Sequence, residues 1–190
     1  MDAVTDLMGR IDEATSRLLG TVKGFSDDDV RAPSRLPGWT RGHVLTHLAR
    51  GAEALTNLLH GARAGEPTRA YASQEARNEA IERGADRGAE ELLADVTAGA
   101  EKFRAAVAIV PDDAWARTVH ILDYPGFPAL QLLTRRLVEV ELHHTDLGAA
   151  YGPDDWPARF AGMDLDEPMR TQRADRKPRG LPDVAGGAGS

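Results

Sequence analysis

The sequence contains no cysteine, which excludes disulfide bonds, thiolate zinc sites and a cysteine nucleophile. Long apolar runs are also missing, and none approaches the roughly 18–20 residues that a membrane-spanning helix needs. The first residues carry charges at Asp2, Asp6, Arg10 and Asp12, so we expect no secretory signal there. These absences predict a cytoplasmic protein without a membrane segment.

Positive charge is in deficit as well. The chain has 23 basic and 30 acidic side chains, a formal net charge of −7. A nucleic-acid-binding surface needs a local basic stripe, and basic residues gather only near the carboxyl end, so we expect no nucleic-acid partner. With 190 residues, 42% of them hydrophobic, the chain is long enough for about one compact domain.

Apolar residues recur every three or four positions in four stretches, as one face of an α-helix requires. Each stretch is amphipathic and must bury its apolar stripe against the others, which predicts an all-α four-helix bundle. The pattern is lost from 112 to 128, so we expect a long connection between the third and fourth helices. All four stripes are used within one bundle, which leaves no surplus patch from which to predict an oligomer. The four stretches are 4–22, 44–59, 93–110 and 130–147.

The carboxyl end differs in composition from the rest of the chain. Residues 164–190 mix five basic and five acidic residues with prolines and a glycine-rich end. Such a segment has too little apolar surface to order itself. We therefore predict a bundle over 1–163 and a disordered tail over 164–190.

The fourth stretch carries a candidate metal-binding pair. Glu139 and His143 are spaced i, i+4, which places both side chains on one face of a helix. They lie on one flank of the apolar stripe, and His47 occupies a similar flank position in the second stretch. Asp146, three residues beyond His143, lies on the same side of the helix. It is placed to hydrogen-bond a metal-ligating side chain without binding the metal itself. Two such helices would form a metal site at the margin of the core.

The residues alone leave other interpretations open. An acid and a histidine at this spacing are more often only a helix-stabilising pair. Glu141 and His144 form a competing pair at i, i+3, although His144 lies on the apolar stripe and is expected in the core. Trp39 and the other tryptophans lie at turns, where the first interpretation is that they fix the angle at which the chain enters a helix. The second interpretation is that they line a substrate site. No phosphate-binding loop or nucleophile elbow is present.

Two motifs resemble a known family. Residues 36–50 read LPGWTRGHVLTHLAR, and residues 136–148 read RLVEVELHHTDLG, followed by Tyr151, Trp156 and Phe160. Both are similar to the mycothiol-dependent maleylpyruvate isomerase family (its metal-binding N-terminal domain), within the DinB-like superfamily. The resemblance covers roughly residues 1–161 and implies a DinB-like four-helix bundle.

The resemblance implies a divalent metal, usually zinc, bound by His47, Glu139 and His143. Three protein ligands leave a fourth position open, as in catalytic zinc sites. The metal would activate the thiol of mycothiol, the cofactor of this family. No catalytic residue beyond the metal site is assigned.

The expected activity is cis–trans isomerisation, or thiol addition to an electrophilic small molecule. A mycothiol S-transferase in detoxification or biosynthesis is one alternative, and a non-catalytic metal-binding or sensing bundle is another. Characterised isomerases of this family carry a second, carboxy-terminal domain that supplies an arginine to the active site. Neither Arg170 nor any other tail residue is assigned that role.

Overall fold

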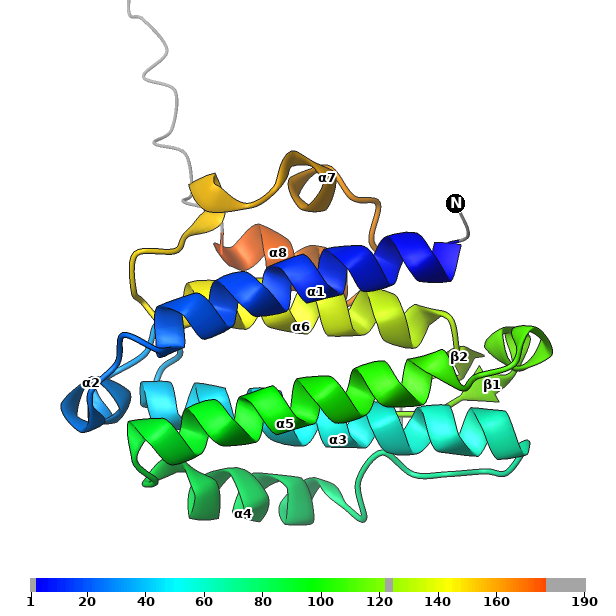
Figure 1. Ribbon diagram of the computed structural model, residues 1–190, viewed down its shortest axis with the longest axis horizontal. Helices are drawn as coiled ribbons and strands as arrows, with labels where there is room; N and C mark the ends of the chain where they lie inside the picture. The colour runs from blue at the N-terminus through cyan, green and yellow to red at the C-terminus, as the bar shows by residue number, and fades with distance from the viewer. Residues whose placement is uncertain (1–2, 122–124, 177–190) are drawn as a thin grey trace, which may run out of the picture.

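The computed structural model describes residues 3–121 and 125–176, and its frame is four long helices that pack side by side (Figure 1). In Figure 1, α1 lies along α6 and α5 lies along α3, and both pairs are in contact. The predicted all-α four-helix bundle is confirmed. The four helices are α1 (Ala3–Val22), α3 (Arg41–Ala64), α5 (Ala89–Ala108) and α6 (Gln131–Asp146).

The long connection between α5 and α6 is also confirmed. It contains a short 3-10 helix, η1 (Asp112–Ala116), and two strands of two residues each, β1 (Thr118–Val119) and β2 (Phe127–Pro128). The strands pair antiparallel, with Val119 opposite Phe127, and both of these side chains are buried. The remaining short elements are α2 (Asp27–Arg31), η2 (Pro153–Asp155) and α7 (Ala158–Ala161).

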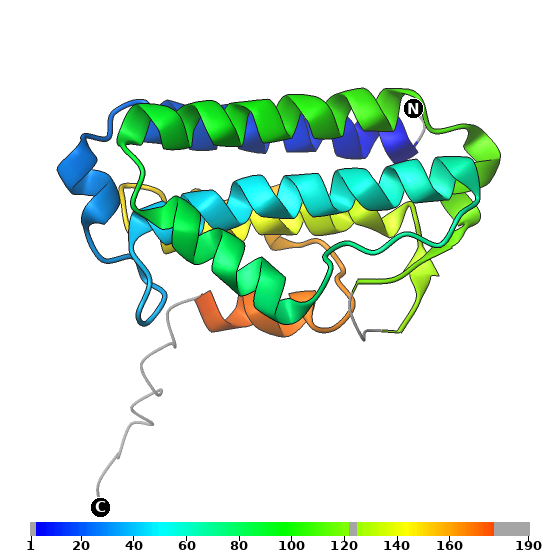
Figure 2. The ribbon, with the colours of Figure 1, turned by 90° about the horizontal axis from the view of Figure 1, so that it is seen from below.

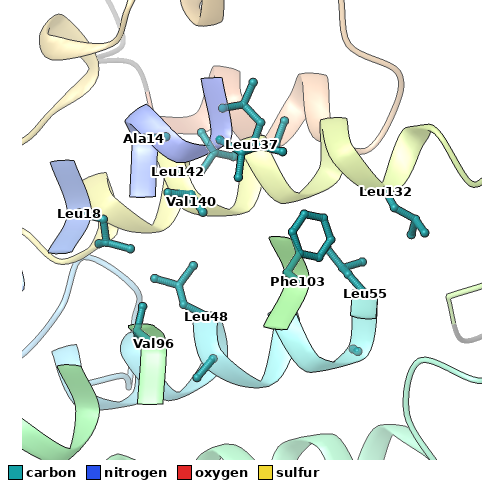
Figure 3. Packing of buried hydrophobic residues seen from close by; sticks show 14 of the residues in the cluster. Ala14, Leu18, Leu48, Leu55, Val96, Phe103, Leu132, Leu137, Val140 and Leu142 are labelled. Atoms are coloured by element: carbon teal, nitrogen blue, oxygen red, sulfur yellow. The ribbon is translucent and has the colours of Figure 1, made fainter. Parts of the chain in front are cut away.

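The core lies between the four long helices (Figure 3). The Phe103 ring from α5 packs among aliphatic side chains such as Leu48, Leu55 and Leu132 from α3 and α6, and all are buried. Since burial of apolar area is the main stabilising term in folding, this cluster fixes how α3 and α6 face each other. Among the described residues, no helix is both long and apolar enough to cross a membrane.

Helix α4 (Gln74–Ala85) was not predicted. It begins at the N-cap Ser73, whose hydroxyl accepts from the Ala76 backbone N–H, and it crosses the outer side of α3 at an oblique angle (Figure 2). Gly42 permits this contact, because a Cβ there would lie 2.2 Å from the Ala85 carbonyl oxygen. Only Ile81, Gly84 and Ala85 of α4 are buried, so the helix has too short an apolar stripe to be recognised by periodicity.

The prediction of a disordered tail is wrong for residues 164–176. This segment folds back on the bundle as α8 (Met169–Arg176), which packs against α6, and both Leu165 and Met169 are buried. Arg176 forms an ion pair with Asp146 of α6. Two apolar anchors and one ion pair therefore order a segment whose overall composition is polar. The rest of the predicted tail, 177–190, lies outside the described residues.

Candidate metal centre

The candidate site lies where the first half of α3 faces the second half of α6. Helix α3 starts at the N-cap Thr40, which accepts from the His43 backbone N–H, and His47 follows in the second turn. On α6, Glu139 and His143 lie one helical turn apart. The buried Arg136 guanidinium donates from Nη1 to the Leu48 carbonyl oxygen at 3.0 Å, which ties α6 to α3 beside His47.

Three side chains that are far apart in the sequence converge here. His47 Nε2 lies 3.0 Å from Glu139 Oε2 and 3.0 Å from His143 Nε2, and His143 Nε2 lies 3.3 Å from Glu139 Oε2. The two imidazole rings meet edge to face, with centroids 4.5 Å apart. The His47 and His143 side chains are 9% and 13% exposed and that of Glu139 is 34% exposed, so the cluster opens toward solvent on the Glu139 side.

The outer nitrogens of both imidazoles also have partners. His143 Nδ1 lies 2.8 Å from Asp146 Oδ2, and Arg176 holds the same carboxylate through Nη2 at 2.6 Å. His47 Nδ1 accepts from Arg77 Nη2 of α4 at 3.0 Å. The cluster therefore has a guanidinium on each side: that of Arg77 contacts the His47 ring directly, and that of Arg176 contacts His143 through the Asp146 carboxylate.

Burial and mutual charge set the protonation of the three groups. Burial lowers the pKa of His47, and the neighbouring His143 lowers it further, against the opposing pull of Glu139. Burial alone would also lower the pKa of His143, but hydrogen bonds to Asp146 and Glu139 outweigh it and raise the pKa to about 9. Burial would raise the pKa of Glu139, yet both imidazoles hold it well below its usual range. Glu139 is thus ionised and His47 neutral at pH 7.

This donor set fits a divalent cation. Its three atoms all lie within 4.8 Å of one another, and a tetrahedral zinc ion with bonds of about 2.0–2.1 Å holds its ligand atoms about 3.3 Å apart. The observed separations of 3.0–3.3 Å need adjustments of only a few tenths of an ångström. Asp146 accepts from His143 Nδ1, so Nε2 is the nitrogen that would bind a cation, in place of the proton it carries at pH 7.

The competing pair, Glu141 and His144, is buried in the core, where both side chains have partners from other parts of the bundle. Glu141 accepts from Arg17 Nη2 at 2.6 Å and from the Tyr151 hydroxyl at 2.5 Å. The His144 ring stacks on Tyr151 with centroids 3.8 Å apart, and its Nε2 lies 2.7 Å from Thr21 Oγ1. These contacts join α6 to α1, so the pair stabilises the bundle and takes no part in the site. The expected core position of His144 is confirmed.

Burial of His144 predicts a loss of stability in acid. Burial lowers the pKa of this ring from 6.5 to about 4. As the pH falls from 6.5 to 4, His144 therefore binds a proton in the unfolded chain but not in the folded protein, and the folded state loses stability. The wild type should lose about 3 kcal/mol more than His144→Phe over this interval, since each pKa unit is worth about 1.36 kcal/mol. Urea unfolding with a chelator present measures both proteins, and equal pH dependence would contradict the prediction.

Two cavities share Tyr71 as a lining residue. The smaller, of about 50 Å³, is lined by Glu139, Gly51, Tyr71 and their neighbours. The larger, of about 1150 Å³, lies at the carboxyl end of α3 beneath the 65–73 segment and is also lined by Tyr71. Tyr71 therefore lines both the cavity that reaches Glu139 and a space large enough for a small-molecule ligand. The Trp39 ring, which precedes the α3 cap, lies edge-on to His47 with centroids 5.7 Å apart.

The sequence profile and the solved structures that match this chain all come from one protein family. Residues 11–148 match the sequence profile described as the mycothiol maleylpyruvate isomerase N-terminal domain. The chain belongs to this family. A crystal structure of the mycothiol-dependent maleylpyruvate isomerase resembles this family member with a TM-score of 0.79 and 31% sequence identity, over 83% of this chain and 65% of that one. A histidine-to-alanine mutant of that isomerase gives the same TM-score at 30% identity.

This family member spans about two-thirds of the solved isomerase chains that it matches, 65% of their length. A comparison with curated protein sequences gave no significant match. The match to the family covers His47, Glu139, His143 and Asp146, whereas Arg176 and α8 lie beyond it.

Sequence reasoning missed two arginines beside the cluster: Arg77, which contacts His47, and Arg176, which contacts Asp146. Arg77 lies on α4, which the periodicity did not indicate, and Arg176 lies in the segment expected to be disordered. A usable signal existed for Arg77, because Ser73 followed by a run without proline or glycine up to Gly84 is typical of a capped helix. Arg176 offered no comparable signal.

Proposed function

We propose that this protein is a cytoplasmic, zinc-dependent enzyme that uses mycothiol and acts on an electrophilic small molecule. The observation that carries the proposal is the convergence of His47 Nε2, Glu139 Oε2 and His143 Nε2 in a member of the mycothiol maleylpyruvate isomerase family. Three ligands leave a coordination position for a further donor, and the cluster opens to solvent on the Glu139 side.

The side chains of this protein hold and orient that site. A divalent cation bound by the three atoms would supply a Lewis acid that lowers the pKa of a thiol. Asp146 fixes the His143 tautomer so that Nε2 faces the cluster, and Arg176 holds Asp146 in place. Glu139 supplies the one negative charge among the ligands. The Trp39 ring packs edge-on against His47.

The reaction follows from the fate of the added thiol. Addition to an activated double bond, rotation and departure of the thiol would give cis–trans isomerisation, whereas retention would give an S-conjugate. The family name favours isomerisation.

Asp146→Ala is expected to weaken zinc binding about 10–100-fold. The change frees the outer nitrogen of His143, and loss of such a partner typically has an effect of this size. Zinc affinity measured by competition with a chromophoric chelator tests the prediction, with Asp112→Ala at an exposed aspartate as the matched control. Equal affinity in Asp146→Ala and the control would contradict it.

Turnover measurements on the zinc-loaded protein test the function. With mycothiol present, loss of maleylpyruvate absorbance with formation of its trans isomer would support the isomerase, and conjugation of monobromobimane above the uncatalysed rate would support the transferase. His47→Ala should abolish either activity. A zinc-loaded protein that accelerates neither reaction would contradict the enzymatic proposal and favour a non-catalytic metal-binding bundle.

A further inference from the structure

The two imidazoles of the cluster differ in what their outer nitrogens contact. His143 Nδ1 faces a carboxylate, Asp146, at 2.8 Å. His47 Nδ1 faces a guanidinium, Arg77, at 3.0 Å. Since a carboxylate accepts and a guanidinium only donates, Nδ1 carries a hydrogen in His143 and a lone pair in His47.

The contact between Arg77 and His47 is incompatible with metal ligation by His47 Nε2. A neutral imidazole has one N–H group and one lone pair. If Nε2 gives its lone pair to a cation, Nδ1 must carry the hydrogen, and that hydrogen would point at the N–H groups of Arg77. Arginine cannot relieve the conflict by losing a proton. The guanidinium must therefore move away when His47 becomes a ligand.

Arg77 forms no ion pair in its present position, although Glu139 lies 3.0 Å from the other nitrogen of the His47 ring. It also contacts the Asn78 side-chain oxygen at 3.2 Å and the Tyr71 side chain, whose ring lies 5.8 Å from the guanidinium carbon. Among residues 3–121 and 125–176 it forms no ion pair. Arg83, six residues later on the same helix, does pair with Glu79 at 3.3 Å. Displaced from His47, the Arg77 guanidinium loses this acceptor and is free to bind another one.

We propose that Arg77 is a movable substrate-binding residue that leaves His47 on metal binding and then holds a carboxylate of the incoming small molecule. A guanidinium binds a carboxylate through two parallel hydrogen bonds, so the site selects electrophiles that carry a carboxylate. The inference rests on the proposed metal-dependent function. It gives this protein an anion-binding arginine within the bundle itself.

Zinc affinity tests the displacement step. Arg77→Met and Arg77→Ala remove the competing contact, and each should bind zinc about tenfold more tightly than the wild type, an effect in the range of one charge-assisted hydrogen bond. Arg83→Met, a matched change on the same helix, should bind zinc as the wild type does. Chelator competition on folded protein gives all four affinities. Unchanged or weaker zinc binding in both Arg77 variants would overturn the proposal.

Thiol binding to the Co²⁺-loaded protein tests the carboxylate step, because a thiolate on Co²⁺ gives a charge-transfer absorption band. The wild type and Arg83→Met should bind 3-mercaptopropionate about tenfold more tightly than the uncharged 2-mercaptoethanol. Both Arg77 variants should lose this preference. Persistence of the preference without Arg77 would overturn the proposal.

The outcomes separate this inference from the proposed function. If the wild type binds neither Zn²⁺ nor Co²⁺, the metal-dependent function fails and the Arg77 proposal fails with it. If both metals bind but neither thiol gives the band, the thiol step of the function fails, and the zinc affinities of the Arg77 variants decide the Arg77 proposal. If metals and thiols bind and Arg77 has no effect, only the Arg77 proposal is overturned.

Discussion

Replacement of Glu139 by glutamine is expected to weaken zinc binding at least about a hundredfold. The change keeps the size of the side chain and removes the only anionic ligand from a set of two imidazoles and one carboxylate. Zinc favours deprotonated ligands, and the loss of one of three leaves a site of two histidines. The Glu139 side chain is 34% exposed, so the variant should still fold. Competition with a chromophoric chelator at pH 7 measures the affinity.

A matched variant separates ligation from the general effect of removing negative charge. Glu79→Gln makes the same chemical change at an exposed position on α4 and should leave zinc affinity unaltered. A Glu139→Gln protein that binds zinc within about threefold of the wild type would show that this carboxylate is not a ligand.

Glu141→Ala is expected to destabilise the fold by about 3 kcal/mol. This carboxylate is buried and accepts from both Arg17 and Tyr151. Truncation leaves a buried hydroxyl without its acceptor and opens a small void, and hydrogen bonds to a charged group are worth about 1.5–3 kcal/mol each. Part of the loss is recovered, because the Arg17 side chain is 34% exposed and can be solvated. Urea unfolding at pH 7 measures the change.

Zinc binding by the folded Glu141→Ala protein should match that of the wild type, since Glu141 contacts no member of the cluster. The two glutamates, two positions apart on α6, therefore have opposite expected effects, with Glu139 governing affinity and Glu141 governing stability. A Glu141→Ala protein that is as stable as the wild type but fails to bind zinc would reverse this assignment.

The bundle and the Glu139–His143 pair were open to prediction from local pattern. Helical spacing depends only on neighbouring residues, and it placed the four long helices within a few residues of their observed ends. The same spacing could not choose between Glu139 with His143 and Glu141 with His144. That choice depends on what α1 and α3 present to each side of α6, and only the family resemblance supplied it.

The contacts around the site were beyond local pattern for two physical reasons. Helix α4 buries little apolar surface and is held by close approach to Gly42, which no periodicity encodes, so Arg77 went unnoticed. Helix α8 owes its order to packing against α6 and to one ion pair, Arg176 with Asp146. Such long-range interactions order segments whose composition alone suggests disorder. They also determine which side chains contact the outer nitrogens of His47 and His143.

Anomalous X-ray scattering at the zinc absorption edge, from crystals grown with one equivalent of Zn²⁺, would locate the metal bound by this protein. The account predicts a single strong peak about 2.0–2.2 Å from His47 Nε2, a Glu139 carboxylate oxygen and His143 Nε2. In the electron-density map from the same crystals, the Arg77 guanidinium should no longer contact His47 Nδ1. A zinc peak elsewhere, or none between these three side chains, would contradict the account.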